Sequence, residues 1–218
     1  MAYKNKVKLP FTSLQELSLQ YCASEHIYSL GFMALPQLRL LGIEALGDFG
    51  DIQRHDCKIL VPYLNDIRIP VNLPSLTHVV LHNICENVIA PFQILKTALA
   101  VTHLVIRSPI PYVLWGLDWL SPSSVEYYCH QLEEFSLYVE SCNYHHVEAI
   151  VNRRSQPLQK LLIAREMMGN IAPSGFQSRA EVAKMMESMV RDGRICVVEE
   201  DLIPRYEVEM ERMRQYMQ

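Results

Sequence analysis

The sequence predicts an α/β solenoid: a curved parallel sheet with helices and loops on its convex side. A short apolar frame, apolar-x-x-apolar-x-apolar, recurs between residues 14 and 197, and turn-like or helix-like segments separate its copies. Internal repeats of this size are typical of stacked units, each of which buries its apolar face against its neighbours. We therefore expect about six to seven irregular repeats and a function located on a surface and not in a pocket.

Each copy of the frame has the pattern of one strand. Its second and third apolar residues alternate with other residues, which is the period of a strand with one buried face. A single strand per repeat places neighbouring strands parallel in one sheet. A weaker seventh copy ends in Ile195 and Val197, with Asp192 at its first position. The complete copies are Leu14-Leu17-Leu19, Leu38-Leu41-Ile43, Leu76-Val79-Leu81, Val101-Leu104-Ile106, Leu132-Phe135-Leu137 and Leu158-Leu161-Ile163.

The segments between the strands differ in how clearly they can be interpreted. Pro36 and Pro74 come just before two frames, where proline favours an extended approach and stops a preceding helix. Segment 178–191 predicts an amphipathic helix with Ser178 as N-cap, Glu181 three residues later and Gly193 as a stop. Shorter helices are expected over residues 144–154 and 91–100. Segment 47–63 remains unassigned, and a strand over 64–69 starts too close to Leu76 for a full repeat.

The two ends of the chain are predicted to differ. Residues 1–11 form an extension without a cap, and residues 12–200 form the repeat domain. Residues 201–218 predict a helix with a stripe at Tyr206, Met210, Met213 and Met217. We expect this helix to cap the last repeat.

Composition indicates a soluble protein of the cytoplasm or nucleus. The net charge of −4 and the pI near 6.1 give no reason to expect nucleic acid or a membrane as partner. The N-terminus lacks the apolar region of a secretory signal, and no apolar run has the length of a membrane span. The six scattered cysteines contain no CxxC pair, so free thiols in a reducing compartment are expected.

The frames resemble leucine-rich repeats, and Leu14-x-x-Leu17-x-Leu19-x-x-Cys22 is the copy that fits best, with Cys22 at the family's Asn/Cys position. Irregular spacing and the openings "LPQLRLL" and "LPSLTHVVL" resemble the repeat regions of fungal F-box proteins. In that family an F-box precedes the repeats and docks on a ubiquitin-ligase adaptor, while the repeats hold the substrate. The resemblance implies a substrate receptor, although there is no room for an F-box before residue 12.

The residues that alternate with the buried positions are expected on the concave face of the sheet. Apolar side chains ringed by Arg, Tyr and His are typical of protein-binding surfaces. The alternative is an ordinary sheet surface with residues of high β-propensity. The residues predicted to bind a protein partner are His78, Val80, His82, His103, Val105, Arg107 and Tyr138.

Histidines and cysteines raise two further possibilities. His78 and His103 occur in the matching strings "LTHVVL" and "VTHLVI", so adjacent strands would place them about 5 Å apart. Such a pair either responds to pH or is simply solvated. The group Cys129, His130, Cys142, His145 and His146 has metal-ligand chemistry, but its spacing lacks the tight pairs of structural zinc sites. We predict neither a metal nor a cofactor.

Catalysis is not predicted, because the sequence has no GxSxG, HExxH, GxGxxG or Gly-rich phosphate loop. The sequence therefore predicts a non-catalytic domain that binds a protein on its concave face. Two alternatives remain: the substrate-receptor part of an F-box ubiquitin-ligase protein, and a truncated paralogue without an independent function.

Overall fold

A computed structural model defines the fold. It describes residues 9–21, 30, 33–46, 73–83, 95, 98–108, 129–139, 142–152, 158–175, 177–199 and 206–217. Within these ranges the chain is an α/β protein that forms a parallel β-solenoid, as the repeating frame predicts. No helix in these ranges is long and apolar enough to cross a membrane.

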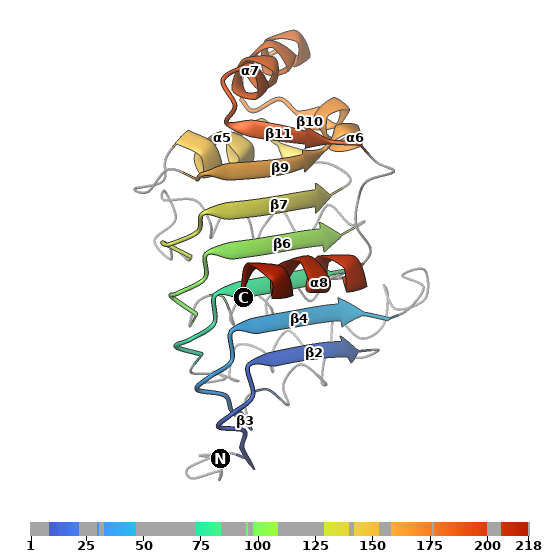
Figure 1. The fold of residues 1–218 in the computed structure, drawn as a ribbon. Helices are drawn as coiled ribbons and strands as arrows, with labels where there is room; N and C mark the ends of the chain where they lie inside the picture. Colours follow the sequence, from blue (N-terminus) through green and yellow to red (C-terminus); the bar gives the residue numbers. More distant parts are fainter. Residues whose placement is uncertain are drawn as a thin grey trace, which may run out of the picture.

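Seven strands form the main sheet, and their spatial order follows the chain (Figure 1). All neighbouring strands are parallel, so the chain must return to the same edge of the sheet before each new strand. The strands are β2 (Glu16–Tyr21), β4 (Leu40–Ala45), β5 (His78–His82), β6 (His103–Ser108), β7 (Glu134–Val139), β9 (Lys160–Ala164) and β11 (Ile195–Val198). Two short parallel pairs accompany the sheet: β1 (Leu9–Pro10) with β3 (Met33–Ala34), and β8 (Cys142–Asn143) with β10 (Ile171–Ala172).

The apolar frame sets the register of this sheet. The second apolar residue of each frame lies opposite its counterpart in the next strand, and the weak seventh frame is confirmed as β11. Because side chains alternate along a strand, this register directs the frame residues to one side of the sheet, where they form the core. The aligned residues are Leu17, Leu41, Val79, Leu104, Phe135, Leu161 and Ile195.

Tight turns come just before the strands β4 and β5. The amide of Leu38 donates to the carbonyl of Leu35 at 3.3 Å, and Leu76 and Leu73 repeat this bond at 3.3 Å. Pro36 occupies the second position of the first turn, where its fixed φ is favourable. After each turn, two successive amides donate to one carbonyl of the preceding repeat, and this shared acceptor stacks the repeats.

Three helices belong to the C-terminal half of the solenoid: α5 (Tyr144–Asn152), α6 (Arg165–Gly169) and α7 (Arg179–Arg191). The predicted helix 144–154 corresponds to α5, which buries Val147 and Ile150 in the core. The predicted helix 178–191 corresponds to α7. The Ser178 hydroxyl accepts from the Glu181 amide at 3.2 Å, and the Glu181 carboxylate accepts from the Ser178 amide at 2.7 Å. This reciprocal cap is the one that the sequence predicts.

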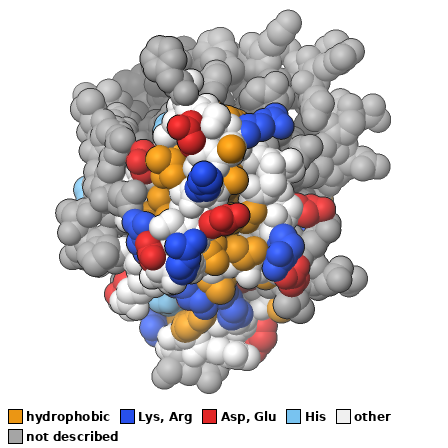
Figure 2. All heavy atoms as spheres, turned by 90° about the horizontal axis from the view of Figure 1, so that it is seen from above, with side chains coloured by type: hydrophobic (Ala, Val, Ile, Leu, Met, Phe, Trp, Pro, Cys, Tyr) orange, Lys and Arg blue, Asp and Glu red, His pale blue; other side chains and the backbone are white. Residues whose placement is uncertain are grey.

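Helix α7 lies beyond β11, at the end of the sheet (Figure 1). It packs Val182, Met186 and Met189 inward. A view onto this end shows side chains of both charges interspersed with hydrophobic ones (Figure 2). A polar outer surface of this kind suits the terminal unit of a solenoid.

Helix α8 (Tyr206–Tyr216) forms as predicted, but its predicted position as a cap on the last repeat is wrong. It lies across the middle of the sheet, in front of β5 (Figure 1), and packs against β4 and β5. The physical reason is that its buried stripe finds apolar side chains on the open side of the sheet, whereas α7 already lies against β11.

Other predictions fall on residues outside the described ranges. They are segment 47–63, the short strand 64–69, Cys22 and most of the helix 91–100. Of that last segment, Leu95 is a buried helical residue, while residues 99–100 form the turn that precedes β6.

Candidate functional site

The site is the side of the sheet opposite the core, which we call the α8 face. The strands β2 to β9 bring its side chains into register, and it corresponds to the face that the sequence analysis treats as concave. Its members are Glu16, Ser18, Gln20, Leu40, Gly42, Glu44, His78, Val80, His82, His103, Val105, Arg107, Glu134, Ser136, Tyr138, Lys160, Leu162 and Ala164.

All seven residues predicted to bind a partner lie on the α8 face, but they are not an open surface. Side chains are buried at His78, Val80, His82, Val105 and Tyr138, whereas His103 and Arg107 are partly buried. Helix α8 covers the centre of the face, which explains why the whole of β5 is buried although it belongs to an open-sided sheet. Most of the residues predicted to bind a partner are therefore buried in this structure.

The apolar part of the contact is the stripe of α8. Tyr206, Met210 and Met213 are all buried in the same cluster as Leu40 and Val80. Gly42 in β4 allows the helix to approach closely. A Cβ atom at that position would lie 2.5 Å from the Met210 Sδ and would also collide with the Tyr206 hydroxyl.

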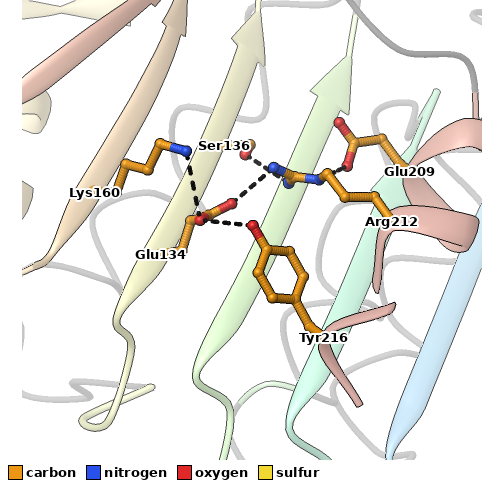
Figure 3. A network of polar contacts seen from close by, with 6 residues as sticks. All are labelled: Glu134, Ser136, Lys160, Glu209, Arg212 and Tyr216. Carbon is orange, nitrogen blue, oxygen red and sulfur yellow. Dashed lines mark hydrogen bonds and ion pairs between the residues drawn. The ribbon is translucent and has the colours of Figure 1, made fainter. Parts of the chain in front are cut away.

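A polar network centred on Arg212 attaches α8 to the neighbouring strand β7 (Figure 3). The guanidinium donates to Glu134 on β7 at 2.9 Å, to Glu209 of its own helix at 2.9 Å and to Ser136 at 3.3 Å. The Tyr216 hydroxyl donates to Oε2 of Glu134 at 3.5 Å, and Nζ of Lys160 lies 3.9 Å from the same oxygen. Burial raises the pKa of Glu209, while Arg212 opposes that shift.

Two further contacts attach α8 to β2 at the edge of the sheet. Arg214 donates from Nε to both carboxylate oxygens of Glu16 at 2.9 Å and from Nη2 to Oε1 at 2.5 Å, so two N–H groups bind the carboxylate in a bidentate charge-assisted pair. The Tyr206 hydroxyl lies 2.7 Å from the Ser18 hydroxyl. Together with the Arg212 network, these bonds tie one short helix to strands on both sides of β5.

The three histidines of the face lie beneath or beside α8. The rings of His78 and His103 stack at 4.5 Å between centroids, close to the spacing expected from the sequence, and Tyr216 covers His103 at 4.9 Å. Burial, followed by the neighbouring His103 and Arg39, lowers the pKa of His78 to about 4. Burial also lowers the pKa of His103. His78 is therefore not a solvated histidine.

His82 has a carboxylate partner on the neighbouring strand. Its Nδ1 lies 3.0 Å from Glu44 Oε1, and Gln20 donates to the other oxygen of Glu44 at 2.8 Å. Burial lowers the pKa of His82, Arg107 adds to that effect and Glu44 opposes it. The ring also lies 5.7 Å from that of Tyr206, so this polar chain runs from β2 to α8.

The group of cysteines and histidines does not assemble into a metal centre among the described residues, where no three potential ligands come together. Cys129 and Cys142 are buried, and burial raises the pKa of the Cys142 thiol to about 12. His145 bonds to the Ser174 hydroxyl at 3.1 Å and lies against His146.

The contribution of α8 to this site was not predicted from the sequence. The stripe of Tyr206, Met210 and Met213 was predicted, but the role of Arg212 and Arg214, which bind carboxylates of the sheet, was not. Two signals in the sequence could have indicated the contact. Glycine inside a strand often marks the close approach of another segment, as at Gly42. Glu16 and Glu134 also sit on the predicted concave face without a cation on the same strand.

Comparison of the chain with protein-family models, with curated proteins and with solved structures gave no match.

Proposed function

We propose that this chain is a non-catalytic protein-interaction domain of the leucine-rich-repeat type, which acts in the cytoplasm or nucleus and binds a protein on its α8 face. The observation that carries the proposal is that this face already binds a helix. It offers apolar side chains, carboxylates and aromatic stacking in one register, and α8 uses all three kinds of contact.

The chemistry of the face supports protein binding more than small-molecule binding. Its carboxylates are spread from β2 to β7, and a helix touches them with arginines that are two residues apart. Extended surfaces with an apolar centre and charged residues around it are typical of protein interfaces. The part that α8 leaves open includes the exposed Lys160 on β9.

A site-specific photo-crosslink tests the proposal in native extract. A photoreactive amino acid replaces Lys160 on the α8 face, and in a matched control it replaces Lys184, which is exposed on α7. We expect a protein adduct from position 160 and none of the same mass from position 184. Equal adducts at both positions, or none at position 160, would contradict the proposed surface.

A second proposal is that the partner is a ubiquitin-ligase substrate, as in the F-box proteins that the repeats resemble. The irregular steps and the "LPQLRLL" and "LPSLTHVVL" openings favour it. Recovery of a ligase adaptor together with the position-160 adduct would support this function. An adduct without any ligase subunit would favour a general interaction domain.

A further inference from the structure

Helix α8 occupies the α8 face in the way that a separate ligand would. Within the described ranges, the hydrogen bonds between α8 and the sheet join side chains to side chains, and none of them continues a strand ladder. The partners are distant in the sequence: Arg214 and Glu16 are 198 residues apart. The helix is also short, with 11 residues. Isolated helices of that length are marginal in water, so α8 depends on the sheet for its helical state.

The acidic groups of the face indicate the charge of its ligand. Glu134 is mostly buried and binds Arg212, and Glu16 binds Arg214 in a bidentate pair. Removing a helix that carries these arginines would leave Glu134 without its main cation. A ligand that replaces α8 therefore needs arginines at equivalent positions, one on each flank of the buried stripe of its helix.

Among the described residues, helix α8 leaves one ring nitrogen of each of two buried histidines, His78 and His82, without a hydrogen bond. The Thr77 hydroxyl donates to the carbonyl of Arg39, so its oxygen accepts from Nδ1 of His78 and leaves Nε2 of that ring as an acceptor. In the neutral ring of His82, Nδ1 donates to the Glu44 carboxylate, so Nε2 is again left as an acceptor. Within the described part of the chain, Nε2 of both rings is buried without a hydrogen-bond partner. A buried acceptor without a donor destabilises the state that contains it, because it has lost its hydrogen bond to water.

We propose that the α8 face recognises an arginine-bearing amphipathic helix of a partner protein, and that α8 holds the face until this partner displaces it. The partner helix carries an aromatic and aliphatic stripe that packs over Gly42 and Val80, arginines for Glu16 and Glu134, and hydrogen-bond donors toward His78 and His82. This inference rests on the proposed function, because it names the partner class for the same face.

Competition between the two helices has a simple physical basis. Because α8 belongs to the same chain, it competes at a high effective concentration. A partner helix that is already stable in its own protein avoids the folding cost that α8 bears, and donors for the two histidines add bonds that α8 does not make. Both effects favour exchange of the helix at the face.

The test uses the full chain and a fluorescent peptide of residues 201–218. In one variant, Met213→Asp places a charge in the buried stripe of α8 and weakens the internal helix. In the matched control, Val208→Asp places the same charge on the exposed side of α8. Anisotropy titration should show at least tenfold tighter peptide binding to Met213→Asp than to wild type, while Val208→Asp matches wild type. Arg214→Ala, at the partly exposed rim of the helix, gives an intermediate gain and serves if Met213→Asp does not fold.

One additional measurement tests the chemistry of recognition. Adding Glu134→Gln to Met213→Asp should weaken peptide binding at least fivefold, because the peptide loses the carboxylate that Arg212 binds. Absence of peptide binding to Met213→Asp, although hydrogen exchange shows its α8 released, would overturn the inference. A position-160 adduct in that case would leave the proposed function intact. Peptide binding without any adduct would contradict the proposed function, and with it the existence of the partner helix.

Discussion

Gly42 is the residue at which α8 comes closest to the backbone of the sheet. Glycine normally weakens a strand, because it has no side chain to pack and loses more conformational freedom on folding. Here its lack of a Cβ atom admits the ends of Tyr206 and Met210. The local cost in β4 is offset by contact between the strand and the helix.

Gly42→Ala should therefore lower the free energy of unfolding by about 1–2 kcal/mol, because Met210 and Tyr206 must move to avoid the new methyl group. Urea unfolding measures the change, and hydrogen exchange shows whether α8 opens more often. Gly169→Ala is the matched control, since nothing lies within 4 Å of a Cβ atom there. An equal loss in both variants would mean that close approach is not the cause.

His78 is the residue that couples the site to pH. Its pKa is about 4 in the folded protein and 6.5 ordinarily. As the pH falls below 6.5, His78 becomes protonated in the unfolded chain but stays neutral in the folded chain. The free energy of unfolding therefore decreases until the pH reaches about 4. The groups around it are His103, Arg39 and Tyr216. Glu209 acts in the opposite direction, because its raised pKa favours the folded state as the pH falls.

We expect the His78 contribution to destabilise the folded chain by about 2 kcal/mol between pH 7 and pH 5. His78→Gln should flatten the profile of unfolding free energy against pH by roughly that amount. Comparison of this variant with wild type removes the opposing effect of Glu209, which both proteins share. Parallel profiles for His78→Gln and wild type would contradict the assignment.

At the scale of elements, side-chain contacts hold the short helix α8 against the sheet. Its stripe supplies burial, and Arg212 and Arg214 bind carboxylates on opposite sides of β5. Ion pairs that are partly buried and share hydrogen bonds contribute more than exposed pairs do. The Arg212 network should therefore contribute measurably to the position of the helix.

A double-mutant cycle with Arg212→Met and Glu134→Gln tests this contribution. Each single change should cost about 2 kcal/mol, because it removes the ion pair between Arg212 and Glu134 and leaves the remaining charge with fewer partners, and the coupling energy should be about 1–2 kcal/mol. The control cycle uses Arg165→Met and Glu199→Gln, an exposed ion pair with bonds of the same type. Its coupling should stay below about 1 kcal/mol. Similar coupling in both cycles would contradict a special role for the network.

At the scale of the whole molecule, stability depends on a core that continues from strand to strand. In a solenoid each repeat is stabilised by the repeats on either side of it. Leu104 lies in β6 between β5 and β7 and is fully buried, whereas Leu17, at the same frame position, lies in β2 at the edge of the main sheet and is partly buried.

Leu104→Ala should thus cost about 3 kcal/mol, and Leu17→Ala about 1 kcal/mol, because the cavity is larger where neighbours surround the side chain. Chemical denaturation of the two variants measures the difference. Equal costs would indicate that β2 is packed as tightly as the central strands.

The sequence by itself determined the repeat, the register and the direction of the sheet. These follow from local pattern: the frame residues from Leu17 to Ile195 alternate along each strand, and prolines mark the turns that precede β4 and β5. The cap of α7 was also predictable, since Ser178 and Glu181 act within one helical turn.

Only the tertiary structure decided where α8 lies and which surface it covers. Periodicity shows that one side of a helix is buried, but it does not identify the surface against which that side packs. The pairing of Arg214 with Glu16 and of Arg212 with Glu134 joins residues that are distant in the chain, and Gly42 gains its role only from the helix above it. The residues predicted to bind a partner were placed on the correct face, but a helix of the same chain covers most of them, because its stripe and charges match that face.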